Sequence, residues 1–156
     1  MKSAKRYYIA YGSNLNLRQM KERCPGAEVV GTSVIPDYKL LFKGSGSGYY
    51  LTIEKKEGGQ VPVAVFSVTK KDEEALDRYE GYPLFYYKND FRLPVELFPG
   101  QERIQLTAFA YIMHEDRRLG LPSRRYMNTC LQGYHDFGFP VGALWKAVEE
   151  SREGRE

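Results

Sequence analysis

Tyr11-Gly12-Ser13-Asn14-Leu15 marks the point where a run of β-forming residues, which starts at Lys5, meets a glycine. We predict a strand that ends here and passes into a loop. Asn16 suits the N-cap of a helix, with Gln19 three positions on, and apolar residues recur at helical spacing until Pro25-Gly26. The chain is therefore predicted to begin with a strand, a tight loop and a helix.

Four short β-like runs are expected next, each bounded by residues that favour turns. The Gly44–Gly48 segment has no G-K-[ST] motif and opens no helical pattern, so we interpret it as a mobile hairpin tip rather than a phosphate-binding loop. This part of the chain is predicted to be a meander of strands. The runs are Ala27–Ile35, Tyr38–Lys43, Tyr49–Glu54 and Val61–Val68, with turns at Pro36-Asp37, Gly44–Gly48 and Gly58-Gly59.

A charged helix is predicted over Lys70–Glu80. Thr69 suits its N-cap, acidic residues gather in its first turn, where the helix dipole favours negative charge, and Gly81 ends it. Phe85–Leu97 and Arg103–His114 follow, and their alternating pattern predicts two strands that pair as a hairpin.

The C-terminal part of the chain is predicted to be helical. Helical spacing starts at Ser123 and is expected to break at Gln132-Gly133, after which Pro140 opens a second helix. Residues 149–156 are almost all charged or small, which predicts a solvated tail. We therefore expect one domain over residues 1–148, followed by a charged tail at 149–156.

Composition narrows the class of protein. The chain has 156 residues, which is room for one domain, and its 42% hydrophobic and 28% charged residues are typical of a folded globular protein. No apolar run approaches the ~18 residues of a membrane-spanning helix, so we expect a cytoplasmic protein with no membrane partner. The net charge of +3 is too small to predict a nucleic-acid partner.

Patterns typical of metal sites and nucleophiles are missing from the sequence. The two cysteines, Cys24 and Cys130, match no zinc or redox spacing and are expected to be reduced and structural. His114 and His135 stand in no metal-binding motif, and Ser13 lacks the G-x-S-x-G context of a hydrolase nucleophile. We therefore expect no metal and no cofactor. The 13 tyrosines instead favour a core or pocket lined by rings with polar tips.

Gly12-Ser13-Asn14 is the first candidate binding segment. A strand that ends in glycine just before a helix exposes several backbone N–H groups at one point, and such groups favour an anion. Gly12 lets a ligand approach the backbone, and Ser13 and Asn14 add side-chain donors. The alternative is an ordinary turn in which Asn14 or Asn16 caps the helix.

Glu80 is the candidate acid/base. An ionised carboxylate is disfavoured in the last turn of a helix, where the dipole is negative, and burial among aromatic rings disfavours it further. Both effects raise the pKa towards the neutral range that a general acid/base needs. The alternative is a solvent-facing glutamate. The nearby rings in sequence are Tyr79, Tyr82, Phe85, Tyr86 and Tyr87.

Tyr126, after Pro122-Ser123-Arg124-Arg125, is a third candidate, and its alternative is a core-facing aromatic on an amphipathic helix. Arg124 and Arg125 carry charges suited to acidic substrate groups, although solvated surface is the default for both.

These residues, in this order and spacing, resemble γ-glutamylcyclotransferase-type proteins, a superfamily that includes plant avirulence-induced and aminoglycoside-tailoring members. The resemblance rests on Tyr11–Leu15 after an N-terminal strand, on Leu76-Asp-x-x-Glu-Gly81 at the end of a helix, and on Tyr126 near the start of a later helix. It implies an α+β fold, with a small, curved, mixed β-barrel flanked by helices.

The resemblance also implies an activity. Such proteins convert a γ-glutamyl amide to 5-oxoproline and a free amine, with no metal or cofactor, and act on a small-molecule γ-glutamyl substrate. Carried over by match, Glu80 is the catalytic acid/base. The substrate-binding residues are Tyr8, Ile9, Ala10, Tyr11, Gly12, Ser13, Asn14 and Tyr126. Tyr82–Tyr87 is more aromatic than in glutathione-pathway members, so the released amine stays open.

Two other functions remain as alternatives. The first is a ligand-binding module on the same fold without turnover. The second is a single-stranded RNA or DNA binder, since aromatic and basic residues share predicted strands, although the small net charge and the missing RNP-type run argue against it. We expect a monomer or a homodimer. The residues behind the second alternative are Tyr49, Tyr50, Tyr86, Tyr87, Phe91, Lys43, Lys55, Lys88 and Arg92.

Overall fold

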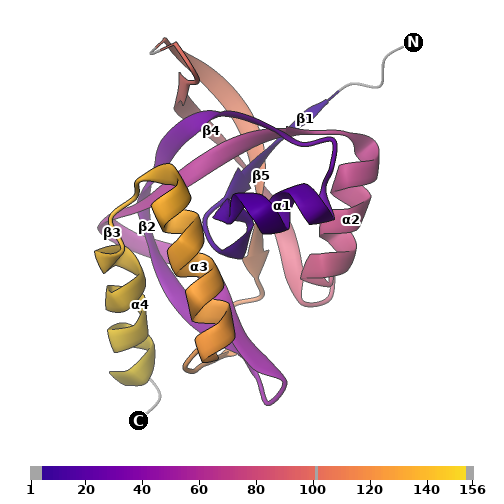
Figure 1. The fold of residues 1–156 in the computed structure, drawn as a ribbon. Coiled ribbons are helices and arrows are strands. Elements are labelled where there is room, and N and C mark those ends of the chain that lie inside the picture. Colours follow the sequence, from indigo (N-terminus) through magenta and orange to yellow (C-terminus); the bar gives the residue numbers. More distant parts are fainter. Residues whose placement is uncertain (1–4, 101, 154–156) are drawn as a thin grey trace.

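In the computed structural model, which describes residues 5–100 and 102–153, five strands close into a β-barrel and a short sixth strand extends it (Figure 1). Neighbouring strands follow the order β3-β1-β5-β4-β2, and β2 pairs back with β3 to complete the ring. The pairing of β1 with β5 is parallel, and the others are antiparallel. The strands are β1 (Arg6–Ala10), β2 (Glu28–Ser45), β3 (Gly48–Val68), β4 (Tyr86–Leu97), β5 (Arg103–Met113) and β6 (Arg118–Leu119). The predicted mixed barrel is confirmed.

Four α-helices of the described residues flank the barrel, and a single 3-10 turn, η1 (Ser13–Leu15), precedes the first of them. In Figure 1, α1 and α3 cross the front of the barrel, α2 lies to the right and α4 to the left. The predicted caps at Asn16 and Thr69 are present, and each side chain accepts a backbone N–H three residues on. Ser123 caps α3 in the same way. The helices are α1 (Leu17–Arg23), α2 (Lys70–Glu80), α3 (Arg124–Phe137) and α4 (Gly142–Glu153).

The four strands predicted between residues 27 and 68 are in fact two long ones, so that part of the prediction is wrong. β2 and β3 stay paired past Pro36-Asp37 and Gly58-Gly59, where Asp37 of β2 lies opposite residues 56–59 of β3 and the register shifts by three residues. Asp37 (φ 61°) and Gly58 (φ 79°) take left-handed conformations there, and the Gly58 N–H donates to Asp37 Oδ1 at 3.0 Å. A bulge of this kind bends a strand without ending it, which lets both strands coil around the barrel. The hairpin tip at Gly44–Gly48 is where the sequence predicts it.

The break predicted at Gln132-Gly133 does not occur, because α3 runs on to Phe137 and ends at Gly138. Gly133 serves a different purpose. A Cβ atom there would lie 2.6 Å from the Asn16 backbone nitrogen and 2.7 Å from the Leu15 carbonyl carbon. The missing side chain therefore lets α3 pack directly onto η1 and hold that turn against the barrel.

The C-terminal tail predicted at 149–156 is also wrong for residues 149–153, which are the last part of α4. Ser151 is buried, and its Oγ accepts the Phe42 N–H at 2.9 Å. Glu150 forms an ion pair with Lys39 at 3.1 Å. Glu149 and Arg152 are exposed, so this segment is part of a docked helix with one side in solvent. Residues 154–156 lie outside the described residues.

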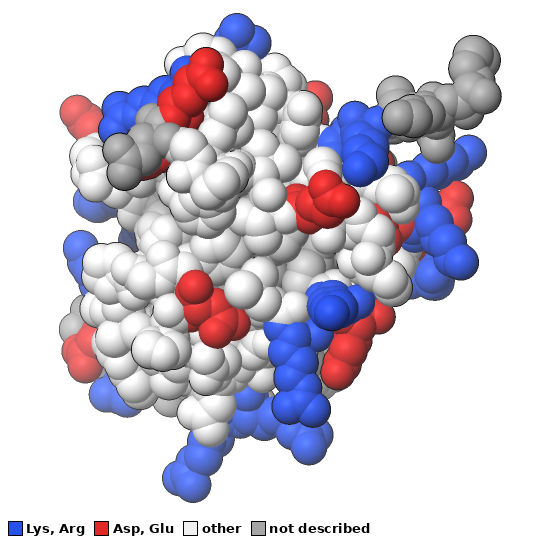
Figure 2. All heavy atoms as spheres, turned by 45° about the horizontal axis from the view of Figure 1, so that its top comes forward, with Lys and Arg blue, Asp and Glu red and all other residues white. Residues whose placement is uncertain are grey.

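Surface charge shows no single dominant patch on the face drawn in Figure 2, where acidic and basic side chains are scattered around a largely uncharged area. Cys24 and Cys130 are buried free thiols, as predicted. None of the helices in the described part of the chain is long and apolar enough to span a membrane.

Candidate active site

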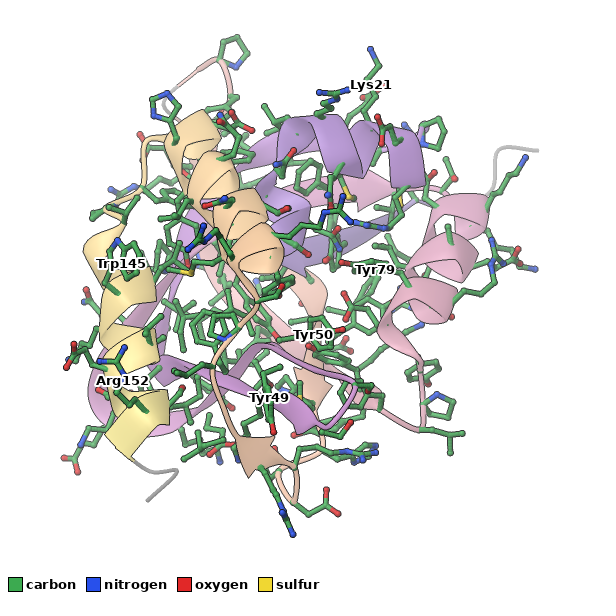
Figure 3. The ribbon with its side chains drawn as sticks, turned by 60° about the horizontal axis from the view of Figure 1, so that its bottom comes forward. Lys21, Tyr49, Tyr50, Tyr79, Trp145 and Arg152 are labelled. Carbon is green, nitrogen blue, oxygen red and sulfur yellow. The ribbon has the colours of Figure 1, made fainter. Side chains whose placement is uncertain are left out.

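A cavity of about 280 Å³ lies where β1, η1, the end of α2 and the start of α3 meet. Tyr50 of β3 and Tyr79 of α2, which both line it, are seen between α3 and α2 in Figure 3. Residues from seven elements and their connections contribute to the wall. They are Tyr8, Ile9, Tyr11, Gly12, Ser13, Asn14, Tyr50, Leu51, Arg78, Tyr79, Glu80, Gly81, Phe85, Tyr86, Tyr111 and Tyr126.

The cavity has a buried floor and an exposed mouth. Tyr8, Tyr11, Tyr86 and Tyr111 are almost fully buried and form the floor together with Leu51. At the other side Tyr79 is 44% exposed, and Arg78 and Gly81 are exposed as well. A ligand in this cavity therefore has one end enclosed by tyrosine rings and the other near solvent.

Tyrosine hydroxyl groups stabilise the wall by binding the free edge of β3. Leu51 is the residue they hold: its N–H donates to Tyr126 Oη at 3.1 Å, and its carbonyl accepts from Tyr86 Oη at 2.8 Å. The Tyr126 ring packs edge-on against Tyr50, with 5.1 Å between ring centroids. Both buried backbone groups of Leu51 are thus satisfied by side chains from other elements, which fixes these rings in the wall.

The loop at Gly12–Asn14 is buried, unlike an ordinary surface turn. Ser13 Oγ lies 3.1 Å from Tyr79 Oη, and Asn14 Nδ2 donates to Tyr8 Oη at 2.8 Å. The first backbone bond of η1 runs from the Leu15 N–H to the Gly12 carbonyl at 3.0 Å, so the amides of Gly12, Ser13 and Asn14 precede the hydrogen-bonded turn. The cap of α1 is Asn16, which leaves Asn14 to the cavity.

Gly12 lies where backbone and cavity meet. A Cβ atom at this position would be 3.3 Å from Leu51 Cδ1 and 3.5 Å from Tyr126 Oη. A larger side chain would therefore extend into the space between β3 and α3.

Glu80 is the last residue of α2, and Gly81, with φ 64°, turns the chain away from the helix. Burial raises the pKa of Glu80 to about 8, and the positive charge of Arg23 opposes this shift. Within the described residues no hydrogen bond or ion pair holds its carboxyl group. The group therefore faces the cavity with a pKa near neutrality, in the direction that the sequence predicts.

Most of the residues proposed from the sequence meet in this cavity. Ala10 does not line it: its side chain is buried in the core, opposite Ala64 of β3. Tyr82 and Tyr87 also lie elsewhere, and the Tyr87 hydroxyl donates to Glu115 Oε2. Arg124 and Arg125 are exposed beside a separate shallow hollow.

The sequence analysis missed Leu51, Tyr111 and Arg23 as parts of the site, and it noted Tyr50 in a different context. Leu51 and Tyr111 lie on strands and reach the cavity through pairing across the barrel, for which a single sequence carries no local signal. Arg23 stacks on Tyr79, with its guanidinium carbon 3.4 Å from the ring centroid. Its place at the end of the first helix gives no hint of that contact. No group of three or more metal-binding side chains occurs among the described residues.

Comparison with known proteins identifies the family of this chain. Residues 8–128 match the model of the family described as gamma-glutamyl cyclotransferase, AIG2-like. The chain belongs to this family. A gamma-glutamylcyclotransferase from Bos taurus is 29% identical over 142 residues, covering 86% of this chain and 72% of the bovine protein.

Two further relatives extend the comparison. A gamma-glutamylcyclotransferase from Homo sapiens is 28% identical over 142 residues, with the same shares of the two chains covered, 86% and 72%. A solved structure of a gamma-glutamyl cyclotransferase has a TM-score of 0.77 at 24% identity, and the match covers 96% of this chain and 87% of that one. At this level of identity the structural likeness shows the fold, which is that of the family.

Proposed function

We propose that this member of the gamma-glutamyl cyclotransferase family converts a γ-glutamyl amide to 5-oxoproline and a free amine, with Glu80 as the general acid/base. The observation that carries this proposal is one cavity whose wall holds both the loop Gly12–Asn14 and a carboxyl group with a pKa of about 8, to which no described residue forms a hydrogen bond. The first group suits proton transfer near neutral pH, and the loop amides suit an anionic oxygen.

The reaction needs no nucleophile from the protein. The loop amides hold the α-carboxylate of the substrate or the oxyanion that develops on its γ-carbonyl. Ionised Glu80 takes a proton from the α-ammonium group, and the free amine attacks the γ-carbonyl carbon to close a five-membered ring. The bond to the leaving nitrogen then breaks, and Glu80 returns the proton to that nitrogen. Because nucleophile and carbonyl belong to one molecule, the protein mainly has to fold the ligand into a reactive shape.

Substrate binding favours the ionised form of Glu80 that the reaction needs. With a pKa of about 8 the free carboxyl group is mostly protonated at pH 7. A substrate ammonium group beside it favours the charged form, so binding of the cationic end releases one proton to solvent.

The leaving amine lies at the mouth in this proposal, because the glutamyl part requires the enclosed end. Tyr50, Tyr79 and Phe85 present rings there, and Arg78 is the charged side chain of the cavity wall besides Glu80. A neutral, aromatic or carboxylate-bearing amine fits these neighbours better than a polyamine, which the arginine would repel.

The test is incubation of the purified protein with a panel of γ-glutamyl amides that carry aromatic, amino-acid or polyamine leaving groups. We expect 5-oxoproline from the panel, with the polyamine amide slowest. Binding of these amides by calorimetry without release of 5-oxoproline would instead support the non-catalytic binding module. Neither binding nor turnover across the panel would contradict both readings.

The loop is tested by Gly12→Val. Its branched side chain would project between Leu51 and Tyr126, so we expect KM to rise by about tenfold or more, since productive binding needs close approach to the backbone. Gly46→Val is the matched control, because none of the described atoms that could meet a Cβ at Gly46 lies within 4 Å of it. Equal kinetics of the two variants would remove the loop from the binding site.

A further inference from the structure

Arg23, the last residue of α1, makes three contacts around the site without lining the cavity itself. Its Nη1 donates to Asn14 Oδ1, and its Nη2 donates to Gln19 Oε1 at 3.4 Å. Its guanidinium carbon lies 3.4 Å from the centroid of the Tyr79 ring, a cation–π stack. No acidic side chain of the described residues forms an ion pair with it. The half-buried guanidinium group of Arg23 therefore binds neutral side chains.

These contacts connect the Gly12–Asn14 loop to the last turn of α2. On one side Arg23 binds Asn14, which in turn donates to Tyr8 Oη at 2.8 Å. On the other side it stacks on Tyr79, whose hydroxyl lies 3.1 Å from Ser13 Oγ. Tyr79 is followed directly by Glu80. The loop and the last turn of α2 are therefore joined through one guanidinium group.

We infer that Arg23 is a positioning residue of this site, which clamps the Gly12–Asn14 loop to the last turn of α2 and so sets the place of Glu80 relative to the loop. This inference rests on the proposed function. A loop amide and a carboxyl group that act on the same substrate must keep a fixed separation, and a misplacement of about 1 Å can cost on the order of 10²-fold in rate.

The chemistry of the side chain suits this role. A guanidinium group is planar, offers several donors in a rigid fork and stacks on a ring, so it binds an amide edge-on and a tyrosine face-on at once. An ammonium group has neither the plane nor the fork. Lysine at this position would keep the charge and lose the geometry.

Arg23 also acts on Glu80 through its charge. Of the groups facing the carboxyl group, Arg23 is the one whose charge lowers the pKa of Glu80. Arg78 of α2 also lines the cavity, on its exposed side. Burial raises the pKa of each tyrosine hydroxyl group around Glu80, so these groups stay neutral near pH 8. These hydroxyl groups belong to Tyr8 of β1, Tyr11 just after that strand, Tyr79 of α2, Tyr86 of β4, Tyr111 of β5 and Tyr126 of α3.

The two contributions of Arg23 separate in a pair of variants. Arg23→Met removes the charge and the fork at similar length. We expect it to lower kcat on the order of 10–100-fold and to move the acidic limb of the pH profile to higher pH, because Glu80 loses the cation that lowers its pKa. Arg23→Lys should return the limb close to its wild-type position while kcat stays low. A merely structural arginine would not produce that split.

Arg18→Met is the matched control, because Arg18 lies on the same helix with its side chain 91% exposed, paired at 3.7 Å with Glu22. It should leave kcat and the pH profile unchanged. The assay is release of 5-oxoproline from the best amide of the panel, with thermal unfolding of each variant recorded alongside. Should Arg23→Met fail to fold, Arg23→Lys decides: a lowered kcat with an unmoved limb supports the clamp, and wild-type kcat overturns it.

The failure of this inference is distinct from a failure of the proposed function. If the wild-type protein releases no 5-oxoproline, the proposed function is wrong. If the wild type is active and a folded Arg23→Met variant keeps its kcat and its pH profile, the proposed function stands and the role of Arg23 is overturned.

Discussion

Asp72 in the first turn of helix α2 and Glu80 at its last residue both carry a carboxyl group, and the two groups have opposite surroundings. Asp72 is 3% exposed, and its carboxylate accepts the N–H groups of Thr69 at 3.0 Å and Gly26 at 3.2 Å. Glu80 stands at the negative end of the helix dipole without a hydrogen bond in the described part of the chain, and burial raises its pKa to about 8. The same chemical group is therefore a structural anchor at one end of a helix and a titratable group at the other.

The largest effect expected from this difference is on activity. Glu80→Gln keeps the size of the side chain but cannot carry a proton, so we expect kcat/KM to fall by about 10²–10⁴-fold while the fold stays intact at pH 7. Asp72→Asn should do the opposite. It presents an amide NH₂ group to a backbone donor and should lower the free energy of unfolding by about 1–3 kcal/mol with kcat nearly unchanged.

Two measurements on both variants check this prediction. Release of 5-oxoproline reports activity, and urea unfolding reports stability. Glu74→Gln, an exposed glutamate on the same helix, is the control and should change neither quantity. If Glu80→Gln stays active, or if Asp72→Asn is as inactive as Glu80→Gln at equal stability, the contrast between the two ends is wrong.

The two ends of α2 are the part of the molecule that sequence predicts best, for a physical reason. Thr69 begins the helix and Gly81 ends it, each through contacts within a few residues, and the dipole is a property of the helix alone. Bulges are harder to predict. Asp37 and Gly58 favour a turn by composition, but the pairing of β2 with β3 continues through them because their φ values allow a bend.

Contacts between residues far apart in the chain could not be predicted from one sequence. Gly133 was interpreted as a helix break because glycine weakens helices, whereas its position is explained by the backbone of Asn16 pressing against it. Tyr111 and Leu51 enter the site only after strands pair, and Arg23 only after α1 packs beside α2. The pattern of residues was enough for the acid/base and the loop, but the walls of the cavity are a product of tertiary structure.

A second prediction concerns pH and activity. Because kcat/KM reports the ionisation of the free enzyme, it should rise about tenfold per pH unit below pH 8 and level off as Glu80 ionises. Between pH 6 and pH 8 this amounts to on the order of 10²-fold. Initial rates at substrate concentrations well below KM measure it, with the titration of the substrate amine determined separately. The residual activity of Glu80→Gln should not show this rise with pH. A wild-type profile that is flat from pH 6 to pH 9 would assign the proton transfer to another group.

The smallest effect expected is on stability, and its sign follows from the same pKa. The folded-state pKa of Glu80, about 8, lies above the ordinary value of 4.5, so the native state holds more protons than the unfolded chain between these two values. Unfolding free energy therefore falls as pH rises from about 4.5 to 8. Since Glu80 still faces the cavity, we expect a loss of only about 1–2 kcal/mol.

Urea unfolding at a series of pH values between 5 and 9 isolates this contribution. Glutamine cannot ionise, so Glu80→Gln should gain stability relative to wild type as the pH rises, and the difference should saturate above the pKa of Glu80. Asp72→Asn, in contrast, should be less stable than wild type throughout and keep the slope that Glu80 causes. Parallel curves for Glu80→Gln and wild type would mean that the carboxyl group is charged without penalty in the native state, and its value as a proton carrier near pH 7 would then have no physical basis.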